Sequence, residues 1–126
     1  GFMALNCILK GNDVFRIAIA VAPVTSWRFY DTVYTEIYNG MPQDNPSGYD
    51  DNSPIRIVDR LEGKLLIAHG TADDNVHIQN TYEMAAQLTA HGKPFEMRIY
   101  PDKNHSMGNA RHHLLERCIE FVKENL

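Results

Sequence analysis

Three short runs of apolar residues divide the chain and predict three strands. Residues 17–22 and 64–69 are apolar through their middle, which is typical of strands covered on both faces. Residues 95–100 alternate between apolar and polar side chains, so we expect this strand to be less covered. Helical patterns separate the runs, and this alternation predicts a parallel sheet with right-handed crossovers.

The segments around the strands carry helical patterns. Helices are expected over residues 2–10, 27–38, from Ser53-Pro54, and over 76–91 and 110–126, with a loop over 39–52. The first is apolar on most sides and is expected to be buried. In the helix expected over 76–91, the buried stripe should consist of Ile78, Tyr82, Ala85 and Leu88. In the helix expected over 110–126, it should consist of Leu115, Cys118, Val122 and Leu126. The order of elements predicts an α/β fold.

Composition and charge narrow the function classes. The chain has 126 residues, 44% of them apolar and 22% charged, which is ordinary for one globular domain. A net charge of -4 and no run of Lys or Arg argue against binding of nucleic acid or an anionic membrane. No apolar stretch approaches the roughly 18 residues of a membrane span. Cys7 and Cys118 match no metal-ligand spacing, and the sequence leaves a disulfide between them open.

The chain begins without the signals of a helix start. Gly1 is not an initiator methionine, and residues 2–10 form a helical pattern that has no N-cap residue before it. There is no signal-peptide pattern either. We therefore expect a fragment of a longer protein.

Polar residues follow two consecutive strands. Asp73 and Asp74 come after the second strand and His105 after the third. Function gathers at the carboxyl ends of parallel strands, and an acid followed by a histidine is the chain order of α/β-hydrolase triads. The alternative is structural: a loop Asp is often a turn former or helix cap, and a loop His is often only solvated.

Aromatic residues crowd the segment after the first strand. Trp27, Tyr30 and Tyr34 share one helical stripe, and a second consists of Phe29, Val33 and Ile37. An aromatic stripe is more often core than pocket. Two stripes on one helix allow one to face the core while the other lines a cavity, and rigid aromatic walls suit the flat ring of proline.

These motifs resemble a known family. Residues 70–77 (Gly-Thr-Ala-Asp-Asp-Asn-Val-His) resemble the acid loop of the dipeptidyl peptidase IV group of the prolyl oligopeptidase family. Residues 20–24 (Ala-Val-Ala-Pro-Val), with Trp27, residues 30–36 and Tyr38, are similar to the same group. The resemblance covers nearly the whole chain. It implies the C-terminal portion of an α/β-hydrolase fold, with a three-stranded parallel sheet remnant and flanking helices.

The resemblance assigns roles to individual residues. It implies that Asp73 is the triad acid and His105 the general base, whereas Asp74 is structural. The substrate-binding residues that it implies are Val24, Trp27, Tyr30, Tyr34, Asn75 and Val76, with Asn75 bonding a substrate carbonyl and Val76 flooring the proline pocket. It implies no metal and no organic cofactor.

The chain also departs from the family. Residues 1–126 would start just downstream of the nucleophile elbow, so the serine, one oxyanion-hole N–H and the N-terminal propeller are absent. Ile17 stands where animal members have a disulfide cysteine, which puts that disulfide in doubt. Without its neighbours, the strand at 17–22 would become a sheet edge, so we expect a homo-oligomer, or the missing half bound to the chain.

The implied function is that of a serine exopeptidase. The parent protein would release N-terminal dipeptides or tripeptides after proline or alanine through an acyl-enzyme, and residues 1–126 alone would be inactive. If the source is bacterial, the resemblance implies a periplasmic or extracytoplasmic location. The alternatives are another α/β-hydrolase, such as an acylaminoacyl peptidase or an esterase, and a non-catalytic α/β binding module.

Overall fold

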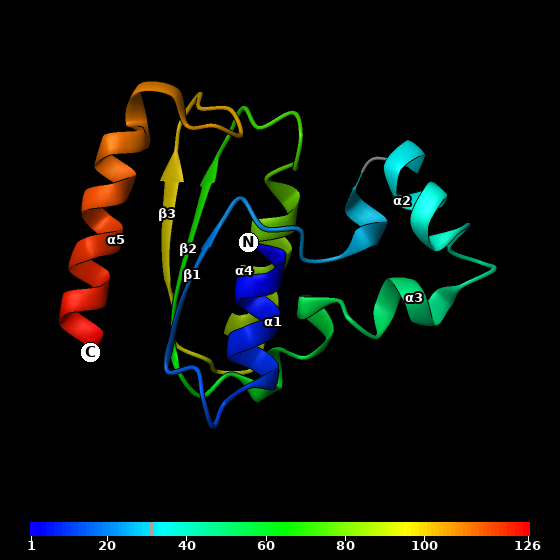
Figure 1. Ribbon diagram of the computed structural model, residues 1–126, viewed down its shortest axis with the longest axis horizontal. Coiled ribbons are helices and arrows are strands. Elements are labelled where there is room, and N and C mark those ends of the chain that lie inside the picture. The colour runs from blue at the N-terminus through cyan, green and yellow to red at the C-terminus, as the bar shows by residue number, and fades with distance from the viewer. Residues whose placement is uncertain (31) are drawn as a thin grey trace.

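The computed structural model describes residues 1–30 and 32–126 (Figure 1). The side chains of residues 29, 32, 33 and 37 also lie outside the description. The second aromatic-segment stripe expected from the sequence, Phe29, Val33 and Ile37, therefore falls outside the described side chains.

A parallel sheet forms the centre of the fold, as predicted. Its order is β1 (Ile17–Val21), β2 (Lys64–Gly70), β3 (Glu96–Tyr100), and all three arrows in Figure 1 point the same way. The central strand β2 is buried from Leu65 onward. The expectation that residues 17–22 are covered on both faces is wrong, because β1 is half-buried along most of its length. It pairs with β2 on one side and lies at the edge of the described sheet.

Helices cover both faces of this sheet. Helices α1 (Phe2–Lys10) and α4 (Gln79–Ala90) lie on one face and α5 (Arg111–Asn125) on the other (Figure 1). The larger hydrophobic cluster lies under α1 and α4 and includes Leu5, Ile8, Leu9, Leu65, Ile67, Met84 and Leu88. A smaller cluster of Ala68, Tyr100, Met107 and Leu114 lies under α5. The two helical layers thus cover both faces of the sheet, and loops occupy its carboxyl edge.

The aromatic segment is not the single helix expected over residues 27–38. A 3-10 turn at Trp27–Phe29 ends at Tyr30, whose backbone is extended, and α2 (Thr32–Asn39) follows. The expected loop over 39–52 contains a short helix, α3 (Pro46–Asp50), in which the Asn45 side chain accepts the Gly48 N–H at 3.1 Å. The helix expected from Ser53 is only a 3-10 turn at Pro54–Arg56, with no side-chain cap from Ser53.

Two of the predicted helix stripes are only partly correct. In the stripe predicted along α4, Ile78 and Leu88 are buried as predicted, but Tyr82 is 48% exposed, and Asn80, Thr81 and Met84 are buried beside the stripe. Asn80 and Thr81 hydrogen-bond Thr25 and His69, and these polar contacts set the rotation of the helix. In α5, Leu115 is 53% and Leu126 81% exposed, and Leu114 and Phe121 face inward instead. Two further 3-10 turns, at Val58–Arg60 and Gly108–Ala110, complete the connections.

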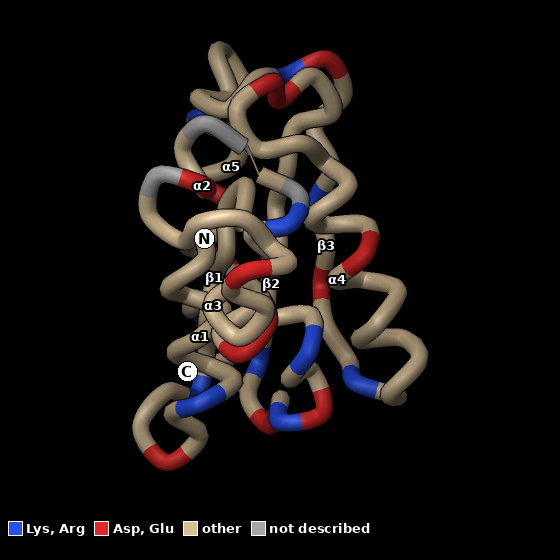
Figure 2. Tube along the Cα trace, turned by 90° about the vertical axis from the view of Figure 1, so that its right-hand side faces the viewer, with Lys and Arg blue, Asp and Glu red and all other residues tan. Residues whose placement is uncertain are grey.

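Charge and sulfur chemistry are simple. Acidic and basic positions are interspersed along the trace (Figure 2). Cys7 and Cys118 are free thiols.

Helix α1 is less buried than expected, because Met3 on its outer side is 66% exposed.

Candidate active site

Two loops meet at the carboxyl edge of the sheet because β2 and β3 are parallel neighbours. The loop after β2 donates the Thr71 N–H to the Tyr100 carbonyl at 3.0 Å and the Ala72 N–H to the Lys103 carbonyl at 3.0 Å. Gly70 allows this approach, since a Cβ built there would lie 2.2 Å from the Lys103 carbonyl oxygen. The loops that carry Asp73 and His105 are therefore held together by backbone contacts.

The carboxyl group of Asp73 faces the imidazole of His105. Nδ1 of His105 lies 2.8 Å from Oδ2 of Asp73, within hydrogen-bond distance, so the loops after the second and third strands bring the acid and the histidine together. The other oxygen, Oδ1, accepts the backbone N–H groups of Asn75 at 3.0 Å and Val76 at 2.8 Å. The Asp73 side chain is 0% exposed and that of His105 is 44% exposed. Because a carboxylate only accepts hydrogen bonds, Nδ1 carries the proton and Nε2 presents its lone pair.

Asp74, the adjacent acid, is exposed. Its neighbour Asp73 is the one that the loop turns inward, as the two N–H bonds to Oδ1 require. An oriented, buried carboxylate beside an accessible imidazole is the arrangement of a general base whose tautomer is set by an acid.

A second histidine lies beneath this pair, and sequence reasoning did not single it out. His69 is 0% exposed, with Nδ1 2.7 Å from the Thr81 hydroxyl and Nε2 2.7 Å from the Val76 carbonyl. Nε2 also lies 3.3 Å from Oδ2 of Asp73. Burial lowers the pKa of His69. The available signal was a polar residue at the end of an otherwise apolar strand, directly before the acid loop.

The aromatic side chains form a cluster despite the break in the helix. The ring centroids of Trp27 and Tyr30 are 5.6 Å apart, those of Trp27 and Tyr34 6.2 Å, and those of Tyr30 and Tyr34 5.4 Å. The Tyr30 hydroxyl donates to Oδ1 of Asn75 at 2.9 Å, which joins the cluster to the acid loop. Val76, in the same loop, is buried, with 4% of its surface exposed.

Val24, the remaining pocket candidate, is 8% exposed. Its neighbour Thr25 is tied to α4, since the Thr25 N–H donates to Oδ1 of Asn80 at 2.9 Å and the Thr25 hydroxyl to the Asn80 carbonyl at 2.8 Å. The structure thus links the segment that carries the aromatic cluster to the helix that follows the acid loop.

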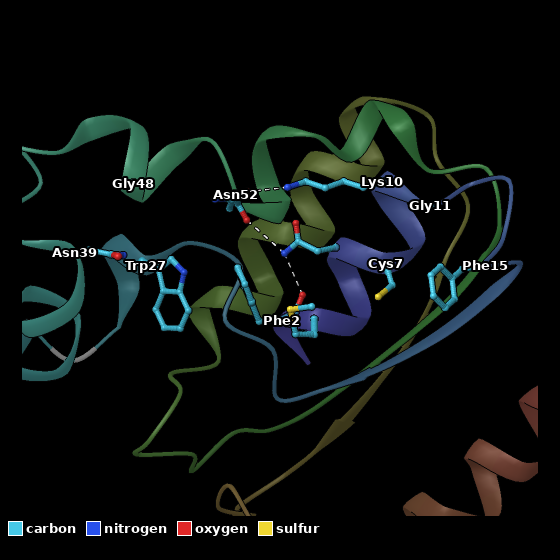
Figure 3. A pocket seen from close by; sticks show the side chains of 11 residues that line it. Phe2, Cys7, Lys10, Gly11, Phe15, Trp27, Asn39, Gly48 and Asn52 are labelled. Atoms are coloured by element: carbon cyan, nitrogen blue, oxygen red, sulfur yellow. Dashed lines mark hydrogen bonds between the residues drawn. The ribbon is translucent and has the colours of Figure 1, made fainter.

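A cavity of about 560 Å³ lies between α1 and the aromatic segment, and neither Asp73 nor His105 lines it. Figure 3 shows Trp27 at one end and Phe15 at the other, with Phe2 and Cys7 between them. A smaller hollow of about 240 Å³ is lined by Trp27, Tyr30 and Tyr49 among others. The aromatic cluster therefore borders open space on two sides.

Among residues 1–30 and 32–126, no group of three or more His, Cys, Asp or Glu is placed to hold a metal ion. Within the same residues no helix has both the length and the apolar character needed to cross a membrane.

A parallel sheet flanked by helices, with an acid loop after one strand and a histidine loop after the next, defines a part of an α/β-hydrolase domain. The chain belongs to the prolyl oligopeptidase family, whose family model matches residues 1–126.

Individual relatives agree with this assignment. The crystal structure of Porphyromonas gingivalis dipeptidyl peptidase 4 is similar at 47% identity and a TM-score of 0.95, over 99% of this chain and 18% of that one. Dipeptidyl aminopeptidase A of Saccharomyces cerevisiae is 44% identical over 94% of this chain and 13% of its own length. Dipeptidyl peptidase 8 of Homo sapiens is 37% identical over 100% of this chain and 15% of its own. The chain thus spans less than a fifth of the length of each of these relatives.

Proposed function

We propose that this chain supplies the acid and the base of a serine peptidase that removes dipeptides or tripeptides from peptide N-termini, after proline or alanine. The observation that carries the proposal is the 2.8 Å contact between Nδ1 of His105 and Oδ2 of Asp73 at the carboxyl edge of the sheet. The dipeptidyl peptidases among the relatives support the reaction class.

In the proposed mechanism the nucleophile is a serine outside residues 1–126. Nε2 of His105 takes the proton of the serine hydroxyl as the oxygen attacks the scissile carbonyl carbon. The same proton then passes to the leaving amine, which departs as the new N-terminus of the shortened peptide. Water repeats the cycle on the acyl-enzyme and releases the N-terminal unit. Asp73 keeps the imidazole in the productive tautomer and stabilises the imidazolium.

The proposed substrate contacts follow from the aromatic cluster. Trp27, Tyr30 and Tyr34 would form the wall against which the proline ring packs, with Val24 and Val76 as its apolar neighbours. The Tyr30 hydroxyl occupies Oδ1 of Asn75 at 2.9 Å, so the amide N–H groups of Asn75 are left to donate to a substrate carbonyl.

A substrate panel tests this function in the intact enzyme that contains the chain. We expect cleavage of Xaa-Pro and Xaa-Ala anilides, or of their tripeptide counterparts, with a free amino terminus. We expect covalent labelling of one serine by a fluorophosphonate. Preference for N-acylated peptides or simple esters would favour another hydrolase of this fold. Absence of both labelling and turnover would refute the proposed peptidase function and would favour a non-catalytic binding module.

We further propose that residues 1–126, when isolated, form a homo-oligomer through the free edge of β1. That strand is half-buried and pairs with β2 alone in the described sheet. Val14 and Phe15, just before it, are 69% and 44% exposed, and Met3 of α1 is 66% exposed. Unpaired strand edges and apolar surface favour association. Light scattering that shows a well-behaved monomer of the isolated chain would refute this.

A further inference from the structure

The buried imidazole of His69 is joined to the acid loop by contacts that have no role in the mechanism above. His69 lies near the end of β2 and is 0% exposed. Burying an imidazole is unfavourable unless its nitrogens are hydrogen-bonded, and an aliphatic residue would continue the apolar run of this strand. Both ring nitrogens are satisfied here, and one of them reaches the loop that carries Asp73.

The partners of His69 define its tautomer. Nε2 lies 2.7 Å from the Val76 carbonyl oxygen, which can only accept, so Nε2 carries the hydrogen. Burial, the largest influence, lowers the pKa of His69 and favours the neutral ring. Nδ1 of a neutral ring is then an acceptor, so the Thr81 hydroxyl donates to it at 2.7 Å. The hydrogen bonds therefore run in one direction, from Thr81 through His69 to the acid loop.

This direction matters for Asp73. The Val76 N–H donates to Oδ1 of Asp73 at 2.8 Å while the Val76 carbonyl accepts from His69, so one residue of the loop is held at both of its backbone groups. The Nε2–H group of His69 also faces Oδ2 of Asp73 at 3.3 Å, the same oxygen that accepts from His105. A change at His69 thus alters the backbone turn and the electrostatic surroundings of the carboxyl group together.

We propose that His69 and Thr81 are positioning residues for Asp73, acting through a directional hydrogen-bond chain from Thr81 to His69 to the Val76 carbonyl. Neither touches the reacting atoms. Their effect is to hold the loop from Asp73 to Val76 so that Oδ2 stays in line with Nδ1 of His105. This inference rests on the proposed peptidase function.

The test compares two substitutions of His69 in the intact enzyme. Met fills a similar volume but has no donor, whereas Gln can present an amide N–H near the position of Nε2. Turnover of an Xaa-Pro anilide is measured per active serine, counted by titration with a fluorophosphonate, so that misfolded protein is not scored. We expect His69→Met to lower kcat per active serine by roughly 10- to 100-fold, since a misplacement of about 1 Å costs rate on that scale. His69→Gln should recover most of it.

A second pair of variants guards against loss of folding. Thr81→Val keeps the shape of the side chain and removes the hydroxyl, whereas Thr81→Ser keeps the hydroxyl. We expect Thr81→Val to lower kcat per active serine several-fold and Thr81→Ser to stay near the unmodified enzyme. Leu88→Ala is the matched control, because Leu88 lies about two turns along the same helix and packs into the core. It should lower the melting temperature without changing kcat per active serine.

The possible outcomes distinguish a failure of the positioning role of His69 and Thr81 from a failure of the proposed peptidase function. If His69→Met and Thr81→Val both keep kcat per active serine within about twofold of their Gln and Ser counterparts, the positioning role is wrong. If His69→Met does not fold, the Thr81 pair decides by the same criterion. If the unmodified enzyme is neither titrated by the fluorophosphonate nor active on the anilide, the peptidase proposal itself fails.

Discussion

Replacing Asp73 by Asn is the sharpest perturbation of the site. Oδ1 of Asp73 accepts two backbone N–H groups, from Asn75 at 3.0 Å and Val76 at 2.8 Å. An asparagine amide must keep its oxygen on that side, because its NH2 group cannot accept. The NH2 group then takes the place of Oδ2, which lies 2.8 Å from Nδ1 of His105 in the unmodified protein, and faces that nitrogen.

This exchange inverts the hydrogen bond to the base. Two donors cannot pair, so Nδ1 of His105 must give up its hydrogen and accept from the amide, which moves the proton to Nε2. A protonated Nε2 has no lone pair for the serine proton. The loss expected in serine proteases of the same chemistry is about 10⁴ in kcat, or about 5.4 kcal/mol of transition-state stabilisation at 1.36 kcal/mol per tenfold.

Stability should change far less than turnover. Both backbone N–H groups keep a neutral acceptor, so the free energy of unfolding should fall by about 1–2 kcal/mol for the loss of charge-assisted bonds. The assay is steady-state hydrolysis of an Xaa-Pro anilide by the intact enzyme, with circular dichroism melts of both proteins. Asp74→Asn is the matched control, because Asp74 is adjacent and exposed. Turnover of Asp73→Asn within tenfold of the unmodified enzyme, or an equal loss in Asp74→Asn, would refute the assignment.

Three further predictions concern neighbouring contacts. Gly70→Ala should lower the free energy of unfolding by about 1–3 kcal/mol in denaturant titrations, since the new Cβ would lie 2.2 Å from the Lys103 carbonyl oxygen. An unchanged denaturation midpoint would contradict this close approach. Tyr30→Phe removes the hydrogen bond to Asn75 and should raise KM for an Xaa-Pro anilide roughly 2- to 12-fold with little change in kcat. A fall in kcat with an unchanged KM would contradict a role of this contact in substrate binding. Burial lowers the pKa of His69 below its ordinary value of 6.5, so the unfolded state binds the proton more readily than the folded state. The free energy of unfolding should therefore fall as the pH drops below about 6.5, by at most about 1.36 kcal/mol per pH unit from this group. Denaturant titrations of the unmodified protein and His69→Gln should diverge in that window, and parallel curves would argue against a buried neutral imidazole.

Local pattern was sufficient for the framework of the fold and for one pair of the site. Apolar runs of strand length separated by helical periods specify a parallel sheet, because only crossover connections accommodate that order. The carboxyl ends of neighbouring parallel strands lie at one edge, so Asp73 and His105 had to approach each other once β2 and β3 were adjacent. Which aspartate faces inward came from the resemblance to a family, and the two N–H bonds to Oδ1 of Asp73 supply its physical reason.

Contacts between distant segments decided the rest. The phase of α4 depends on Asn80 meeting Thr25, 55 positions away, and periodicity treats such polar residues as solvent-facing. The part played by His69 could not be read from the sequence either, since a histidine in an apolar strand has no defined partner until the loop folds over it. Its tautomer is set by the Val76 carbonyl and the Thr81 hydroxyl. Hydrophobic pattern is a local, short-period property, whereas a buried polar group is tolerated only where tertiary structure brings its partner, and so the polar interior of this site was determined by the fold.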